Sequence, residues 1–255
     1  IRRDDALVAV AGGAEAPITP LTLAAFQGSG VLSTRNDDPA GSSRPLDEAR
    51  DGFVLGEGAA IVTLEALEVA DARGAKILAE IEGSGMSFSP GSGGIPEMEA
   101  AQIGQAIQLA LVSSGRIQSE VDVLALHAAG SIEADRIEAV GVHRIFGSSA
   151  RHHLYTPALK GHTGHLLGAS GPLTVAVMLE AINRGKIPPT LNLDVEDAEV
   201  DLDGNAKGVR EDHVLVSLVS ATGWAHNAAL ALASPRAMRE FVPPETGEVM
   251  AITTE

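Results

Sequence analysis

The sequence predicts an α/β fold built from layers of helices on a sheet. Short apolar runs typical of strands alternate along the chain with longer segments whose apolar residues recur at helical spacing. Hydrophobic residues make up 45% of the 255 residues but aromatic residues only 3%, so Ala, Val, Leu and Ile must form the core. Side chains of this size favour close packing of helices on a sheet. A chain of this length can bury a full core as one domain or as two closely packed halves.

The pattern also places the individual elements. The first strand is expected to be short, buried and ended by Gly12 and Gly13, and the last two strands to form a hairpin. Strands are expected at residues 7–11, 59–64, 77–83, 121–126, 214–220 and 227–233. Helices are expected at residues 21–26, 65–73, 97–114, 132–146 and 173–183, and residues 1–6 resemble the end of an earlier helix. Loops are expected at 84–96 and 194–212, and a partner-bound tail at 238–255.

Charge and composition narrow the function classes. A formal net charge of −16 argues against nucleic acid and against an anionic membrane surface as partners. No apolar run reaches the roughly 18 to 20 residues of a membrane-spanning helix, and no signal-peptide pattern is present, so we expect a location in the cytoplasm or an organelle matrix. The chain contains no cysteine, which excludes a cysteine nucleophile among these residues. His143, His152 and His153 lack ligand-like neighbours, so no metal site is predicted.

Residues 160–172, KGHTGHLLGASGP, form the stretch best suited to chemistry. The stretch combines Lys160 with two histidines, the second being His165, and its glycines allow tight turns before a helical run. A cation and an imidazole at the start of a helix would bind or polarise an acyl carbonyl or carboxylate, because helix N-termini favour negative charge. By spacing alone, a glycine-rich surface turn with incidental histidines fits equally well.

His127 is the second candidate. It ends an expected strand and precedes small residues and a helix, so its side chain would face a cleft, although a hydrogen-bonded structural histidine also fits. Asp135 and Glu138 lie three residues apart on one face of that helix. The polar segment 34–51 interleaves arginines with aspartates and fits a solvated loop.

Residues 160–171 resemble the lysine and second-histidine motif of β-ketoacyl-acyl-carrier-protein synthases, the thiolase-fold condensing enzymes of fatty acid and polyketide synthesis. Further stretches resembling the family are 33–39 (STRNDDP), 43–47 (SRPLD), 50–58 (RDGFVLGEG) and 187–194 (IPPTLNLD). They follow the family's order across most of residues 1–233, which is far more specific than a single motif. The resemblance implies a thiolase-like layered αβαβα fold, of which this chain would hold the C-terminal half and the end of the N-terminal half.

The resemblance also implies an organisation of the chain. Residues 1–83 would form the end of the N-terminal half and the crossover, residues 84–235 the C-terminal half, and residues 236–255 a tail. Ile1 would lie soon after the nucleophilic cysteine, so we expect either a partial polypeptide or a subunit whose first half is a separate chain. A hetero- or homodimer with a ketosynthase-like subunit would follow, with acyl carrier protein as the second partner.

In the mechanism that the resemblance implies, a cysteine-bound acyl chain is extended by decarboxylation of a malonyl-carrier thioester. His127 and His165 would stabilise the oxyanions, and Lys160 would orient one of them. Glu138 would pair with Lys160 and keep it charged, with Asp135 in support, although two solvated charges fit the same spacing. No resident cofactor is implied, because the phosphopantetheine is carried by the acyl carrier protein. The resemblance also implies a salt-bridged brace beneath the site, formed by Arg44, Asp47, Arg50 and Asp51.

Two departures from the family pattern bear on function. The first histidine motif, HGTxT in the family, is HAAGS here, with Ala128 and Ala129 in place of the glycine and first threonine and Ser131 in place of the second threonine. The turn that reads NSFGFGGTN in the family is VSATGWAHN at residues 219–227. Gly223 then occupies the position of the gating phenylalanine, and Trp224 and His226 replace a glycine and a threonine. Ser131, Thr163, Gly223 and Trp224 are the expected acyl- or pantetheine-binding positions.

Three hypotheses follow. The favoured one is a non-catalytic subunit of the chain-length-factor kind, which pairs with an active ketosynthase and shapes its acyl tunnel. The second is the C-terminal piece of an active synthase whose cysteine lies in another piece. The third is a pseudoenzyme that serves as a structural subunit of a larger assembly.

Overall fold

The computed structural model describes residues 1–3, 5–89, 98–147, 150–204, 208–223, 225–238 and 250–253. Its centre is a seven-stranded sheet in the order β1-β2-β9-β3-β8-β7-β4. All neighbouring strands are antiparallel except β4 and β7, which are parallel. The strands are β1 (Val8–Glu15), β2 (Gly58–Ala66), β3 (Ile77–Phe88), β4 (Val123–Ala125), β7 (Val216–Gly223), β8 (His226–Ala233) and β9 (Met250–Thr253), and β5 (Lys186–Ile187) pairs with β6 (Arg210–Glu211) separately.

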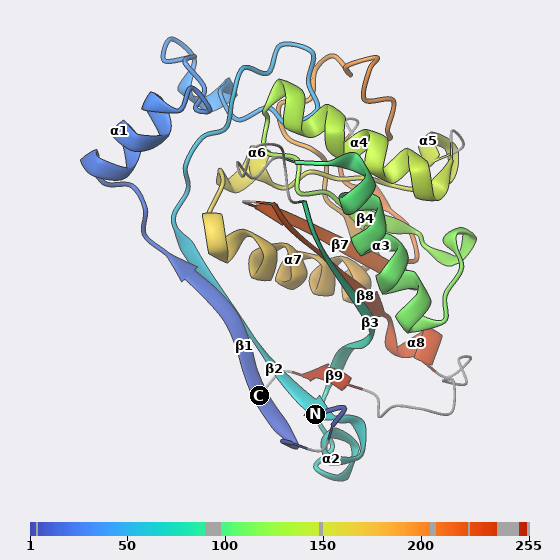
Figure 1. The fold of residues 1–255 in the computed structure, drawn as a ribbon. Coiled ribbons are helices and arrows are strands. Elements are labelled where there is room, and N and C mark those ends of the chain that lie inside the picture. Colours follow the sequence, from blue (N-terminus) through green and yellow to red (C-terminus); the bar gives the residue numbers. More distant parts are fainter. Residues whose placement is uncertain are drawn as a thin grey trace.

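Helices cover both faces of this sheet, as the α/β prediction requires (Figure 1). On one face lie α3 (Ala100–Ser114) and α4 (Ile132–Phe146), and on the other lies α7 (Ser170–Arg184). The shorter helices are α1 (Pro20–Gly28), α2 (Leu67–Ala72), α5 (Ala150–His153), α6 (Lys160–Thr163) and α8 (Pro235–Met238). Three single 3₁₀ turns are η1 (Pro39–Gly41), η2 (Gln118–Glu120) and η3 (Leu167–Ala169).

Within the described residues, the two largest of three core clusters lie on opposite faces of the sheet, because successive strand residues point to opposite faces. In β4, Leu124 contributes to the cluster beneath α3 and α4, whereas Val123 and Ala125 contribute to the cluster beneath α7. Close packing of α3 on β3 depends on glycine, since a Cβ at Gly85 would lie 2.0 Å from the Ala106 carbonyl oxygen. The small side chains of the core therefore allow the tight helix-on-sheet contact that the composition predicted.

Most expected elements are confirmed, and four details are wrong. The described part of residues 1–6 forms turns, not a helix. β1 continues through both glycines because it pairs with β2 along its whole length, and it is largely exposed, with Val10 72% accessible. β3 extends to Phe88, and the rest of the expected loop, residues 90–96, lies outside the described residues.

The fourth correction concerns the expected tail. Its residues 250–253 form β9, which pairs with β2 on one side and β3 on the other, so the chain's own sheet accommodates them. Residues 239–249, 254 and 255 lie outside the described part. The division into 1–83, 84–235 and 236–255 stays a prediction. None of the helices within the described residues is long and apolar enough to cross a membrane.

Candidate active site

Two imidazoles from distant parts of the chain meet at one end of the sheet. His127 follows β4 directly, and His165 lies in the loop between α6 and α7. Their ring centroids are 5.1 Å apart and the ring planes cross at 81°. The ring of Phe53 packs edge-on against His165 from another side, with centroids 5.2 Å apart. The convergence of the two histidines that the sequence predicted is therefore present.

The His165 loop is held by the segment that precedes β2. The His165 amide donates to the Val54 carbonyl at 2.7 Å, and the Gly56 amide donates to the His165 carbonyl at 3.0 Å. These backbones approach so closely that a Cβ at Gly56 would lie 2.1 Å from the Thr163 carbonyl oxygen. Gly164 adopts φ +69°, a conformation that glycine reaches without strain. Gly56 and Gly164 thus fix where His165 lies.

Lys160 connects the two histidine segments. Its side chain is buried, and its Nζ donates to the His127 backbone carbonyl. Burial lowers the pKa of Lys160 to about 8, against the opposing effect of the Glu138 and Asp135 carboxylates. The backbone carbonyl of Lys160 in turn accepts a 2.6 Å hydrogen bond from Ser43. The ammonium therefore acts on His127 through its main chain.

Glu138 occupies a different place from the one the sequence predicted. No ion pair joins it to Lys160 within 4 Å in the described structure. Its carboxylate accepts hydrogen bonds from the His127 and Ala128 amides at 2.8 and 2.7 Å and from Ser220 Oγ at 3.0 Å. Burial raises the pKa of Glu138, and the two amides oppose that rise. The Glu138 carboxylate therefore positions the His127 backbone through its two amide hydrogen bonds. It acts on Lys160 only as a nearby negative charge.

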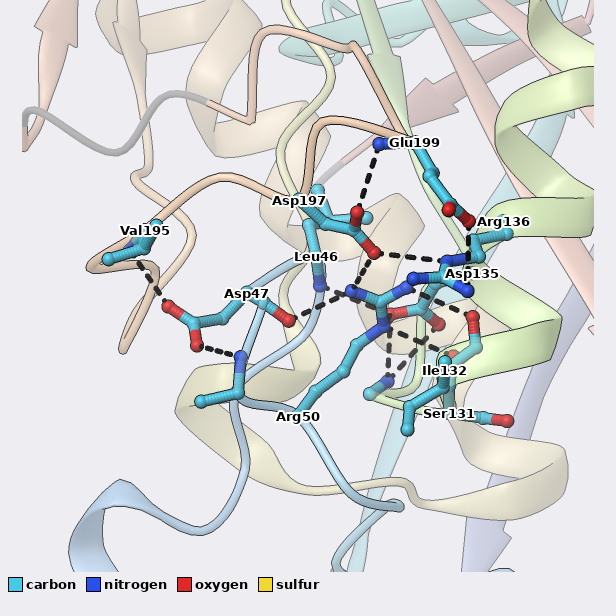
Figure 2. Close-up of polar contacts among 12 residues, drawn as sticks. Leu46, Asp47, Arg50, Ser131, Ile132, Asp135, Arg136, Val195, Asp197 and Glu199 are labelled. Atoms are coloured by element: carbon cyan, nitrogen blue, oxygen red, sulfur yellow. Dashed lines mark hydrogen bonds and ion pairs between the residues drawn. The ribbon is translucent and has the colours of Figure 1, made fainter.

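Asp135 holds the turn that follows His127. It accepts hydrogen bonds from the Ala129 and Gly130 amides at 3.0 and 3.2 Å and from the Leu46 amide at 3.1 Å. Burial raises its pKa against the effect of those amides and of Arg50. The guanidinium of Arg50 lies 3.4 Å from Asp135, so this carboxylate links the turn after His127 to the polar segment 34–51 (Figure 2).

The expected brace forms only in part, because Arg50 pairs with carboxylates outside the predicted set and Asp51 makes no ion pair within the described residues. Arg50 is fully buried and also contacts Asp197 at 2.9 Å (Figure 2). Arg44 pairs with Asp47 at 2.9 Å. Asp51 binds no arginine directly but accepts hydrogen bonds from Ser33 Oγ and the Thr34 amide and hydroxyl. Because these charges are fully or largely buried, the brace holds the segment rigidly against the site.

Both imidazoles are neutral in this environment. Burial, with Lys160 and His165 nearby, lowers the pKa of His127 well below its usual value. Burial and the nearby Lys160 lower the pKa of His165 to about 3. His127 Nδ1 accepts from the Thr222 amide at 3.3 Å. Within the described part of the chain, neither Nε2 has a protein hydrogen-bond partner, so both remain available to a ligand.

Comparison with known proteins gives the family. The sequence matches the family description "Beta-ketoacyl synthase, N-terminal domain" over residues 1–70 and "Beta-ketoacyl synthase, C-terminal domain" over residues 78–194. Together the two matches span well over half of the chain. The chain belongs to the β-ketoacyl synthase family.

Individual ketosynthases are similar over most of the chain. The 3-oxoacyl-[acyl-carrier-protein] synthase 2 of Coxiella burnetii is 39% identical over 224 residues, which are 88% of this chain and 54% of that protein. A type II polyketide ketosynthase in complex with its acyl-carrier protein matches with TM-score 0.87 and 26% identity, over 91% of this chain and 57% of that one. The ishigamide ketosynthase/chain length factor matches with TM-score 0.81 and 31% identity, over 89% and 54%. The chain spans about half the length of the relatives it matches.

The expected pantetheine-binding positions lie near the two histidines along the chain or next to Thr222. Ser131 is the N-cap of α4, where its hydroxyl accepts from the Ala134 amide at 3.4 Å. Thr163 is exposed and donates to the Gly164 carbonyl, and Gly223 is exposed at the end of β7. Trp224 lies outside the described residues. Binding of an acyl or pantetheine chain by these residues stays a prediction.

Sequence reasoning missed several residues of the site. Ser170 and Thr222 hydrogen-bond the two imidazoles, and Ser220 hydrogen-bonds Glu138. Small polar residues inside apolar strand and helix patterns were the only available signal, and many such residues elsewhere are purely structural. The roles of Ser220 and Thr222 become visible only once β7 is placed beside β4, whereas Ser170 lies five residues from His165 along the chain.

Proposed function

We propose that this chain supplies the histidine–lysine half of a β-ketoacyl-ACP synthase site, which a cysteine from outside these residues completes. The observation that carries the proposal is the His127–His165 pair, with centroids 5.1 Å apart and the buried Lys160 bonded to the His127 backbone. Such an arrangement presents two neutral N–H donors to one point. The similarity to 3-oxoacyl-[acyl-carrier-protein] synthase 2 supports the same conclusion.

The chemistry follows from those donors. In decarboxylation of a malonyl thioester, the bond between the carboxylate and the α-carbon breaks, CO₂ leaves, and the electron pair moves onto the thioester oxygen. Nε2–H groups of His127 and His165 would stabilise that enolate oxyanion. The α-carbon then attacks an acyl thioester, and a cysteine thiolate leaves. Because the chain contains no cysteine, this thiolate must come from elsewhere.

The substrate carrier and the partner are part of the proposal. The malonyl group would arrive on the phosphopantetheine of an acyl carrier protein, so the protein itself needs no resident cofactor. A solved ketosynthase in complex with its acyl-carrier protein has the same fold, as does a ketosynthase/chain length factor. A ketosynthase-like subunit and an acyl carrier protein are therefore the partners we propose.

The test measures malonyl-carrier decarboxylation by the native assembly. His127→Ala and His165→Ala should each lower kcat by about 10² to 10³-fold, the usual cost of losing one oxyanion donor. The matched control is His162→Ala, because His162 lies in α6, just before the His165 loop, but is exposed and hydrogen-bonds the Pro189 carbonyl. Rates that stay equal to the control would refute the proposal. The proposal would also be refuted if a reactive acyl-thioester donor, added to the native assembly, labelled no cysteine in any polypeptide that accompanies this chain.

A non-catalytic chain-length-factor role is the second candidate. The buried methyl groups of Ala128 and Ala129, 1% and 5% exposed, replace the glycine and a threonine hydroxyl of the first histidine motif, and Ser131 uses its hydroxyl as a helix cap. These changes leave fewer groups to hold a pantetheine arm. In this role the His127→Ala and His165→Ala variants would keep full elongation activity, whereas substitutions in the tunnel wall would change product length.

A further inference from the structure

His165 is held on its Nδ1 side by its own loop. Nδ1 lies 3.1 Å from the Leu167 amide nitrogen and 2.9 Å from Ser170 Oγ. Leu167 adopts φ 45°, a left-handed conformation that costs a non-glycine residue about 1 kcal/mol or more. Ser170 is the first residue of α7 and is only 7% exposed. A strained turn and a buried hydroxyl therefore converge on one nitrogen.

Counting the protons fixes the tautomer of His165. A backbone amide can only donate, so Nδ1 must present its lone pair to Leu167. Ser170 Oγ already accepts a 2.8 Å hydrogen bond from the Leu166 amide. The single hydroxyl proton of Ser170 then points to Nδ1, which makes Nδ1 the acceptor of two hydrogen bonds. The proton of the neutral ring must lie on Nε2.

We infer that Ser170 is a positioning residue, which together with the Leu167 amide holds His165 as a fixed Nε2–H donor facing the site. A ring locked in this way donates to an oxyanion but does not accept a proton, because protonation of Nδ1 would set its new N–H against the Leu167 amide. The nearby Lys160 acts in the same direction by lowering the pKa of His165, and the other titratable group that faces the ring is His127. The catalytic meaning of this inference rests on the proposed function, whereas the tautomer does not.

The experiment uses the native assembly with ¹⁵N-labelled histidine in this chain. NMR reports which ring nitrogen is protonated, and a His165→Gln variant assigns the signal. Ser170→Ala removes the hydroxyl donor. The matched control is Thr174→Val, because the buried Thr174 hydroxyl donates to the Ser170 carbonyl at 2.9 Å in the same turn and does not touch His165.

Wild type and Thr174→Val should both show an unprotonated, hydrogen-bonded Nδ1 and a protonated Nε2. In Ser170→Ala the Nδ1 resonance should move toward that of a less hydrogen-bonded nitrogen, and kcat for decarboxylation should fall about five- to tenfold, the effect of one lost hydrogen bond. A protonated Nδ1 in wild type, or a Ser170→Ala resonance identical to the control, would overturn the inference. If the NMR result holds while wild type shows no decarboxylation, the proposed function fails and the role of Ser170 in fixing the ring stands.

Discussion

Lys160 is the residue whose charge state most directly links the environment of the site to its chemistry. Its ammonium is buried and contacts the His127 carbonyl, and two carboxylates act on it only through space. Removal from water disfavours the charged form, which explains why its pKa falls to about 8 even with Glu138 nearby. A lysine in this position is therefore charged at neutral pH but loses its proton in mildly alkaline solution.

Lys160 gives a prediction of pH dependence. Because the charged ammonium is a stronger donor to the His127 carbonyl than the neutral amine, decarboxylation should decline as the pH rises through about 8. Lys160→Met should reduce the rate at pH 7 and remove the decline. The measurement is kcat against pH for both proteins. A wild-type profile that is flat from pH 7 to about 9 would contradict the role given to this ammonium.

Arg50 gives a prediction of stability. The buried guanidinium lies between Asp135 and Asp197, so Arg50→Met would leave the buried Asp135 without its cation and Asp197 with Arg136 alone. Breaking a buried ion pair from one side costs about 3 to 5 kcal/mol, and we expect a loss of that size in the free energy of unfolding. Denaturant titration measures it. The control is Arg184→Met, whose exposed pair with Glu180 should contribute less than about 1 kcal/mol.

At the scale of elements, the site depends on contacts between backbones more than on side-chain packing. The segment before β2 and the loop before α7 exchange main-chain hydrogen bonds around His165, and glycine alone fits where they touch. The carboxylates of Asp135 and Glu138 hold the turn after β4 by accepting hydrogen bonds from its backbone amides. His165 is thus positioned by a segment that lies far from it in sequence, and the turn carrying His127 by the helix that follows it.

Gly56→Ala tests this arrangement. Its Cβ would lie 2.1 Å from the Thr163 carbonyl oxygen, so the loop carrying His165 must move. We expect a loss of about 1 to 3 kcal/mol in unfolding free energy, as for other overpacked positions, together with loss of most decarboxylation. Gly28→Ala is the control, because a Cβ there meets nothing within 4 Å. If both substitutions changed the unfolding free energy and the decarboxylation rate equally, the close contact at Gly56 would have no role in positioning His165.

At the scale of the whole molecule, a buried carboxyl makes the stability of the sheet sensitive to pH. Glu80 lies in β3, is 4% exposed and is near Glu82, whose carboxylate pairs with Arg116. Burial, followed by the repulsion of Glu82, raises the pKa of Glu80 to about 7 from 4.5. The folded protein therefore holds this proton more tightly than the unfolded chain does.

The sign of the effect follows from linkage. Because the folded-state pKa is raised, the unfolding free energy should decrease as the pH rises from about 4.5 to about 7. Glu80→Gln should remove this decrease and stabilise the protein by about 1 to 2 kcal/mol at pH 8, with little effect at pH 4. Thermal or denaturant unfolding at both pH values measures the difference. A stabilisation of equal size at pH 4 would contradict the explanation.

Sequence reasoning predicted the α/β layers, most of the helices and strands, and the three residues His127, Lys160 and His165. The structure confirms the layers and most of the elements, because periodicity is a local property of the chain, whereas the catalytic roles of the three residues stay a prediction. Glu138 was assigned the wrong partner, because spacing places it on the correct helix face but does not say which neighbour its carboxylate turns toward. The exposure of β1 and the pairing of β9 were also missed, since both depend on which strands lie side by side.

The sequence by itself determined the chemistry that this protein brings to a site: two imidazoles, one ammonium and no thiol. Only the tertiary structure decided that both imidazoles are neutral, that each accepts a hydrogen bond at Nδ1, and that the ammonium acts through a main-chain carbonyl. The physical reason is that protonation and hydrogen bonding depend on burial and on groups that are distant along the chain, such as Thr222, which lies 95 residues from His127. These contacts are set only when the sheet assembles.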